Sequence, residues 1–177
     1  MAGRNIGVAV DFSSCSKAAL RWASTNLARN GDKLILIHVN NSYQNEQGSV
    51  HLWEQSGSLD LMCPTKAGLE YYPFLLAHSS LWPSSHDVTR TYGVSPDKES
   101  IEILTQVTNQ RGIEVFAKIF YGDPAKKLYE AVDLASLSCM VIGSRGLSTL
   151  KRALMGSVST YIVNHAACPV TVVKENM

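Results

Sequence analysis

The feature that most constrains the fold is an alternation of short apolar runs with stretches of helical periodicity. Residues 6–10 and 33–39 are β-prone apolar runs, which are typical of strands buried on both faces. Between them apolar residues recur at helical spacing, Ser13 or Ser14 offers an N-cap, and Gly31 follows the expected helix end. This stretch predicts a strand-helix-strand unit with a right-handed crossover.

The second half of the chain repeats this plan. The expected elements are a helix from Ser95-Pro96-Asp97 to Gly112, a strand over 114–120, a helix beginning at Asp123-Pro124, a strand over 139–142, a helix ending at about His165 and a strand over 170–173. We therefore predict an α/β fold with a five-stranded, mostly parallel, doubly wound (Rossmann-like) sheet and helices on both faces.

The length of 177 residues and the apolar content of 45% fit one compact domain over residues 1–177. Residues 41–96 depart from the alternating pattern, because they lack sustained periodicity and contain several prolines and aromatic residues. A structureless insert of this length is unusual in a compact domain. We interpret it as an irregular excursion that partly packs on the core.

The charge balance narrows the range of partners. With 16 basic and 15 acidic residues, the chain has no electrostatic feature that favours nucleic acid or an anionic membrane as a partner. No apolar run reaches the length of a secretory core or a membrane span. We expect a soluble, intracellular protein of the cytoplasm, with the nucleus as a second location. The four cysteines form no CxxC pair, so we expect reduced thiols and no metal site.

The stretch GSRGLSTLKRALMGSVST follows the apolar run 139–142 and carries the strongest functional signal. In an open α/β sheet, ligands bind beyond the carboxyl ends of the strands. Gly143 and Gly146 can adopt positive φ and admit a ligand close to the backbone, while Gly156 removes a Cβ in front of the next helix. Ser157 can cap that helix, whose free N–H groups suit a phosphate, and Ser159 can add a hydroxyl donor.

Each of these signals also has an ordinary structural explanation. Glycines often follow strands to turn the chain, and a serine N-cap is common in any helix. Basic residues such as Arg145, Lys151 and Arg152 usually form a solvated face. Taken together, the spaced glycines, the capping serine and the nearby positive charges favour anion binding.

Asp11 and Val39 end the first and second predicted strands and should lie at the same sheet edge as Gly143. A carboxylate at this position can accept hydrogen bonds from ribose hydroxyls or face a phosphate-bound cation. An Asx turn into the following helix explains Asp11 equally well. The Val39 backbone could meet an adenine edge, or the residue could belong to the core.

Other signatures of nucleotide enzymes are missing from the sequence. There is no GxxxxGK[ST], no GxGxxG after the first strand and no GxSxG elbow. The five histidines have no evident nucleophile or carboxylate partners nearby in the sequence, and we expect His38 to be a packed, hydrogen-bonded side chain. We therefore assign no catalytic residue and expect a protein that is not an enzyme.

The glycine pattern can be written G-x-x-G, nine residues, G-[ST], which Gly143, Gly146, Gly156 and Ser157 satisfy. Together with VAVDFS, LILIHV, YGDPAKKL and CPVTVVK, it resembles the universal stress protein family in its small single-domain plant form. The resemblance covers roughly residues 4–58 and 92–174, and the glycine pattern is that of the ATP-binding branch. Residues 59–86 do not follow the sequence pattern of the family.

The resemblance implies a five-stranded parallel α/β fold, a homodimer formed through residues 170–173, and weak or absent hydrolysis. The implied ligand is an adenine nucleotide, ATP or alternatively AMP, with Mg²⁺ as a candidate companion. The implied nucleotide-binding residues are Val10, Asp11, Phe12, Val39, Gly143, Ser144, Arg145, Gly146, Gly156, Ser157, Val158 and Ser159.

The function expected from this resemblance is that of a dimeric nucleotide-dependent switch or chaperone-like partner in a stress response. Two alternatives stay open. One is an interaction module of the same fold whose site is blocked by residues 59–86, and the other is a slow ATPase.

Overall fold

The structure is a computed structural model, and it describes residues 3–40, 59–60, 98–111, 113–145 and 155–175. Most of the predicted excursion over 41–96 lies outside these ranges, as do Gly146 and the basic residues Lys151 and Arg152. The predicted helix start at residues 95–97 also falls outside them.

The described chain alternates strands and helices as the sequence predicts. The strands are β1 (Asn5–Ala9), β2 (Lys33–Asn40), β3 (Leu59–Asp60), β4 (Glu114–Tyr121), β5 (Cys139–Gly143) and β6 (Val170–Val173), and the helices are α1 (Ser14–Trp22), η1 (Ala23–Leu27), α4 (Lys98–Arg111), α5 (Pro124–Leu134) and α6 (Ser157–His165). They form one sheet in the order β3-β4-β2-β1-β5-β6. The five longer strands are mutually parallel, which confirms the predicted sheet.

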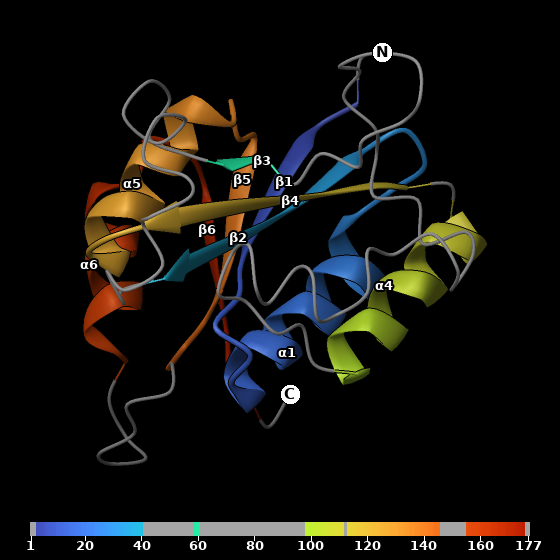
Figure 1. The fold of residues 1–177 in the computed structure, drawn as a ribbon, viewed down its shortest axis with the longest axis horizontal. Helices are drawn as coiled ribbons and strands as arrows, with labels where there is room; N and C mark the ends of the chain where they lie inside the picture. The colour runs from blue at the N-terminus through green and yellow to red at the C-terminus, as the bar shows by residue number, and fades with distance from the viewer. Residues whose placement is uncertain (1–2, 41–58, 61–97, 112, 146–154, 176–177) are drawn as a thin grey trace.

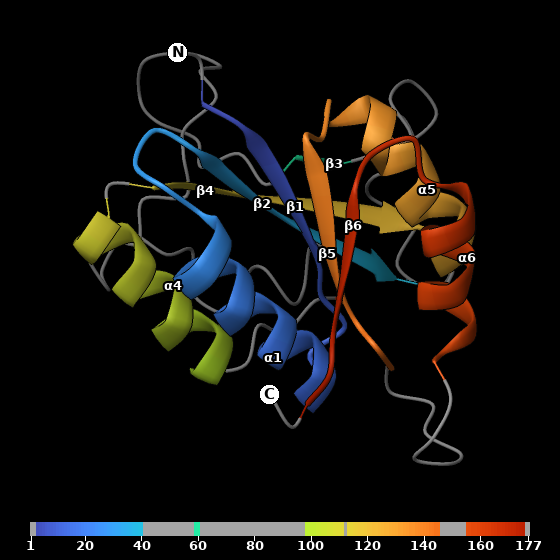
Figure 2. The same ribbon diagram turned by 180° about the vertical axis from the view of Figure 1, so that it is seen from behind.

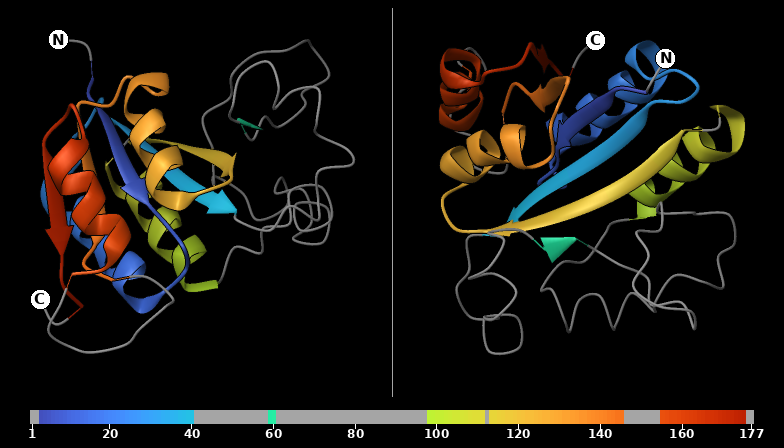
Figure 3. Two further views of the ribbon diagram at one scale, coloured as in Figure 1. Left: turned by 90° about the vertical axis from the view of Figure 1, so that its left-hand side faces the viewer. Right: turned by 90° about the horizontal axis from the view of Figure 1, so that it is seen from above.

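β3 is an addition that the sequence pattern did not predict. It pairs antiparallel with β4, with Leu59 opposite Ile119 and Asp60 opposite Lys118. Figure 3 shows it beside β4, at the edge of the sheet away from β6. The excursion therefore contributes two residues that cover the β4 edge.

Helices cover both faces of the sheet, as Figures 1 and 2 show. α1 and α4 lie on one face, where Ala19, Leu20 and Leu104 pack into a cluster with the buried side of β1 and β2. α5 and α6 lie on the other face, where Leu128 and Ile162 pack into a second cluster. Since both faces of the central strands are buried, their sequences read as continuous apolar runs.

The helix starts follow the local signals in the sequence. Ser13 caps α1 by accepting a hydrogen bond from the Ser16 N–H at 3.2 Å, and Asp123 caps α5 by accepting from the Lys126 N–H at 2.9 Å. Pro124 occupies the first turn of α5, where its missing N–H removes no helical bond.

The end of the first helix differs from the prediction. After Trp22 the backbone widens into the π-helix η1, in which the Ala28 N–H donates to the Ala23 carbonyl at 2.9 Å. Gly31 lies beyond it in a turn with φ of 86°, a conformation that glycine adopts without strain.

Among the described helices, none has the length and apolar character needed to cross a membrane.

An ion pair fastens this turn to the start of β1. The Arg4 side chain donates from Nη2 to Asp32 Oδ2 at 2.6 Å and from Nε to Asp32 Oδ1 at 3.2 Å. The Arg4 and Arg29 backbone N–H groups also donate to this carboxylate. The Asp32 side chain is only 7% exposed, and its hydrogen bonds with Arg4 lower its pKa from 3.8 to about 2.

We expect Asp32→Asn to lower the free energy of unfolding at pH 7 by about 2 kcal/mol, because it removes charge-assisted hydrogen bonds from a buried acceptor. The Asp32 pKa is lower in the folded chain, so its contribution is present above the unfolded value of 3.8 and is lost as the pH falls toward 2. Urea unfolding of both proteins from pH 7 to pH 2 measures the difference, which should shrink across that window.

Glu114→Gln serves as the control for Asp32→Asn. Glu114 pairs with Lys33 at 3.9 Å, and both side chains are about half exposed, so its removal should change stability by less than about 0.5 kcal/mol. A loss for Glu114→Gln equal to that for Asp32→Asn would contradict the importance given to burial.

Candidate functional site

The predicted site residues that the structure describes lie where the strand order of the sheet reverses. β1 pairs with β2 on one side and with β5 on the other. The strands on the β2 side continue to β4, and those on the β5 side continue to β6, so the two halves of the sheet are built outward from β1 in opposite directions. The carboxyl ends of adjacent parallel strands at such a switch point form the usual ligand crevice of an α/β sheet. Asp11 and Phe12 follow β1, Val39 is the second-last residue of β2, and Gly143 ends β5.

The carboxylate of Asp11 forms the Asx turn that the sequence offered as its structural explanation. Asp11 Oδ1 accepts from the Ser13 N–H at 3.0 Å and from Ser13 Oγ at 2.6 Å, while Ser13 caps α1. Both of these bonds are made to Oδ1, and Asp11 is half-buried. A role of Asp11 toward ribose or a cation stays a prediction.

Phe12 adopts the left-handed conformation with φ of 62°, which is uncommon for a residue with a side chain. Its ring lies beside that of His38, with 5.2 Å between the centroids and 33° between the planes. This backbone conformation turns the chain from the end of β1 into α1. The sequence contains no glycine or asparagine at this position to signal it.

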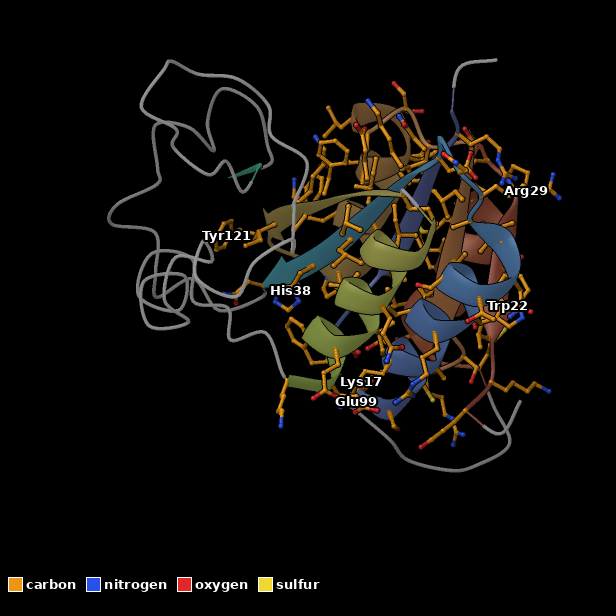
Figure 4. The ribbon with its side chains drawn as sticks, turned by 90° about the vertical axis from the view of Figure 1, so that its right-hand side faces the viewer. Lys17, Trp22, Arg29, His38, Glu99 and Tyr121 are labelled. Carbon is orange, nitrogen blue, oxygen red and sulfur yellow. The ribbon has the colours of Figure 1, made fainter. Side chains whose placement is uncertain are left out.

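His38 is a packed, hydrogen-bonded side chain, as expected, but the sequence did not indicate that it belongs to the site. Figure 4 shows it at the carboxyl end of β2. Its Nδ1 lies 2.8 Å from the Val10 carbonyl oxygen, and since a carbonyl only accepts, Nδ1 carries the proton. Burial lowers the pKa of His38, against the opposing effects of the Val10 carbonyl and the Asp11 carboxylate.

The backbone N–H and C=O of Val39 face the β1 side of β2, at a level beyond the end of β1. The Val10 N–H donates to the Ile37 carbonyl at 2.9 Å, so the backbone of Ile37 faces β1. Backbone groups alternate sides along a strand, and Val39 therefore faces the same way, beyond the end of β1. This orientation is the one that the predicted contact with an adenine edge requires.

Gly143 lacks a side chain for a reason that the sequence did not reveal. Among the described glycines, positive φ values occur at Gly31 and Gly122, so the predicted positive φ of Gly143 is wrong. A Cβ on Gly143 would lie 2.8 Å from the backbone carbon and oxygen of Cys15. Its absence allows the first turn of α1 to pack directly against the end of β5.

The two ends of the loop after β5 are joined by hydrogen bonds to one carbonyl. The Gly156 N–H donates to the Ser144 carbonyl oxygen at 2.8 Å, and Ser159 Oγ lies 3.1 Å from the same oxygen. Ser159 Oγ also lies 3.0 Å from the Gly156 carbonyl, and its side chain is buried. The Ser159 hydroxyl thus holds the described ends of the loop together, and its predicted contact with a ligand stays a prediction.

α6 begins one residue earlier than predicted, because Gly156, and not Ser157, is its N-cap. The exposed Ser157 is the first helical residue, followed by Val158 and Ser159. The N–H groups of these three residues have no acceptor within the helix, and the positive end of the helix dipole lies with them. Arg145 lies at the other described end of the loop and is partly buried. This arrangement suits an anionic group.

No cluster of three or more His, Cys, Asp or Glu side chains within the described ranges could hold a metal ion. The described cysteines, Cys15, Cys139 and Cys168, form no disulfide with one another. Burial raises the pKa of the Cys139 and Cys168 thiols.

The sequence profile of the family described as "Universal stress protein family" matches residues 3–174. Universal stress protein PHOS34 from Arabidopsis thaliana is 31% identical over 176 residues, which cover 98% of this chain and 62% of that protein. Universal stress protein PHOS32 from the same plant is 30% identical over 178 residues, which cover 98% and 65%. The chain thus spans less than two thirds of the length of these relatives.

Solved structures share the fold. The structure of protein MJ0577 has a TM-score of 0.59 at 20% identity, covering 98% of this chain and 97% of that one. A universal stress protein family protein from Arabidopsis thaliana with AMP bound has a TM-score of 0.53 at 20% identity, covering 97% and 91%. The universal stress protein from Archaeoglobus fulgidus in complex with dAMP has a TM-score of 0.54 at 16% identity, covering 98% and 100%.

Gly143 and Gly156 are the two motif glycines that the structure describes, and their surroundings predict different responses to alanine. Gly143→Ala places its Cβ 2.8 Å from the Cys15 backbone and should cost about 1–3 kcal/mol of stability. Gly156→Ala meets its nearest atom, Arg145 Cα, at 3.5 Å with φ of −63°, and should cost less than about 1 kcal/mol. Thermal unfolding measures both, and equal losses would contradict the packing role of Gly143.

Proposed function

The chain belongs to the universal stress protein family, and we propose that it binds an adenine nucleotide, ATP or AMP, across the carboxyl ends of β1, β2 and β5. The observation that carries the proposal is the meeting, at one switch point, of the Asp11 turn, the outward-facing Val39 backbone and the first turn of α6. The family relatives solved with AMP and with dAMP support the same ligand class.

The Asp11 turn, the Val39 backbone and the first turn of α6 each suit a different part of the ligand. The N–H groups at the start of α6 would bind the phosphate, because they are positively polarised and lack helical acceptors. The half-buried Asp11 carboxylate would accept a hydrogen bond from a ribose hydroxyl. The Val39 backbone would pair with the adenine edge. If the ligand is ATP, the Asp11 carboxylate would also help to hold a phosphate-bound Mg²⁺.

We further propose that the nucleotide is bound without turnover, as a signal in a switch or chaperone-like role. Asp11 is the only carboxylate among the predicted site residues, and it already participates in the turn that begins α1. An interaction module with an empty site and a slow ATPase are the competing functions. Calorimetry with AMP and Mg-ATP, followed by a phosphate-release assay, separates the three.

Ser157→Asp tests the phosphate end of the site. A carboxylate at the first position of α6 stabilises the helix through its dipole but repels a bound phosphate. We expect an unchanged or raised melting temperature and an affinity for AMP that falls by at least about tenfold, or about 1.4 kcal/mol. Isothermal titration calorimetry with AMP measures it, and Ser157→Asn, which lacks the charge, should bind nearly as well as the wild type.

Adenosine provides the second control, because it has no phosphate to be repelled. Its affinity should be the same for Ser157→Asp and the wild type. Unchanged AMP affinity in Ser157→Asp would exclude α6 as the phosphate-binding element.

We also propose that the chain forms a homodimer through β6. β6 lies at one edge of the sheet, and at the other edge the two residues of β3 pair with β4. The Ser144 N–H donates to the Val173 carbonyl, and the Met140 N–H donates to the Pro169 carbonyl. The carbonyl groups of Pro169 and Val173 therefore face β5. By alternation, the backbone of Val172 faces outward, where a second β6 could pair with it.

Val172→Pro removes an outward N–H of β6 and no bond to β5, so it should convert the dimer to a monomer with the fold retained. Size-exclusion chromatography with light scattering measures the mass, and circular dichroism checks the fold. Val172→Thr, which keeps the N–H and a β-branched side chain, should stay dimeric. A wild-type chain that runs as a monomer at every concentration would refute the proposal.

A further inference from the structure

The hydrogen-bond ladder between β1 and β2 changes donor at its last rung. Val10 donates its N–H to the Ile37 carbonyl, and a regular parallel ladder would next join the Val10 carbonyl to the Val39 N–H. The Val10 carbonyl instead accepts from Nδ1 of the His38 side chain at 2.8 Å. A side chain of β2 has thus taken the place of a backbone donor of β2.

We propose that His38 is a positioning residue for the base end of the nucleotide site, and that its Nδ1–H occupies the Val10 carbonyl so that the Val39 N–H is left to the base. This inference rests on the proposed adenine-nucleotide function. Val10 is buried, so its carbonyl needs a donor in the folded chain. By supplying that donor, His38 ends the ladder one rung early without leaving a buried acceptor unsatisfied.

The same ring also supports the turn that carries Asp11. Val10 and Phe12 flank Asp11, and His38 contacts both, through the hydrogen bond to Val10 and through its ring beside Phe12. Phe12 holds a left-handed backbone conformation that needs support from its surroundings. His38 therefore links the backbone expected to meet the base with the carboxylate expected to meet the ribose.

The position of the donor within the ring defines the test variants. Asn carries its amide N–H close to the place of Nδ1, whereas Gln carries it farther out, close to the place of Nε2. His38→Asn should therefore keep the bond to Val10 and His38→Gln should lose it. His38→Phe retains a ring beside Phe12 and removes the donor.

Amide hydrogen exchange tests the inference on the ligand-free protein. In the wild type the Val39 amide should exchange quickly, because the Val10 carbonyl is occupied by His38. In His38→Phe the ladder should close, and Val39 exchange should slow by about tenfold or more. Slow Val39 exchange already in the wild type, or no change in His38→Phe, would overturn the inference.

Ligand titrations test the consequence for binding. His38→Phe and His38→Gln should lose affinity for AMP by about tenfold, the equivalent of one hydrogen bond, and should retain affinity for ribose 5-phosphate. His38→Asn should retain both affinities. Equal losses for AMP and ribose 5-phosphate would indicate a general structural role and would refute the positioning role.

The two experiments separate failure of this inference from failure of the proposed function. If the wild type binds neither ligand, the nucleotide proposal fails, while the exchange of Val39 still decides whether His38 holds the last rung. If His38→Phe does not fold, the comparison of His38→Asn with His38→Gln decides the same point, because both are polar replacements of the same ring.

Discussion

The central position of β1 determines where every other part of the candidate site lies. β1 forms parallel ladders with β2 and with β5, and residues 6–9 of β1 are buried between the helix layers. The pairing of β1 with β2 ends at Ala9 and its pairing with β5 ends at Val8, so both ladders end at nearly the same level along β1. The groups beyond that level, in the Asp11 turn, at Val39 and after Gly143, consequently face a common space.

The packing of α1 against this edge adds a second constraint. The first turn of α1 reaches the end of β5 because Gly143 has no Cβ. α1 is joined to α4 by ion pairs of Lys17 and Arg21 with Glu99, and Figure 4 shows Lys17 beside Glu99. The pair of Lys17 and Glu99 is partly exposed and contributes little by itself. The close contact at Gly143 matters more, because a side chain there would push the helix and the Asp11 turn away from the sheet.

Signals that act over a few residues allowed most of the fold to be predicted. Continuous apolar runs identified the five parallel strands, and Ser13 and Asp123-Pro124 marked two helix starts, because caps depend on adjacent residues alone. β3 could not be predicted, since a two-residue strand carries no periodicity. The widened turn η1 was missed for a related reason: no proline or glycine marks it in the sequence.

The positions of Asp11, Val39 and Gly143 near the carboxyl ends of their strands could be predicted from the sequence, but the internal contacts of the site residues could not. Gly143 lies against the first turn of α1 and the Ser159 hydroxyl joins the described ends of the loop, while the ligand contacts expected of both stay predictions. These roles depend on contacts between segments far apart in the chain, which spacing within a motif does not describe. The same holds for His38, whose partner Val10 lies 28 residues away.

Satisfied polar groups at both ends of the site give it a form suited to binding. At one end, Gly156 and Ser159 both bond the Ser144 carbonyl, so the described ends of the loop are held beside α6 before any ligand arrives. At the other end, His38 satisfies Val10. Because internal bonds use these buried acceptors, the donors that remain, the first N–H groups of α6 and that of Val39, can face a ligand. Because the described loop ends are already held in place, they lose less conformational entropy on binding than loop ends that must first be ordered.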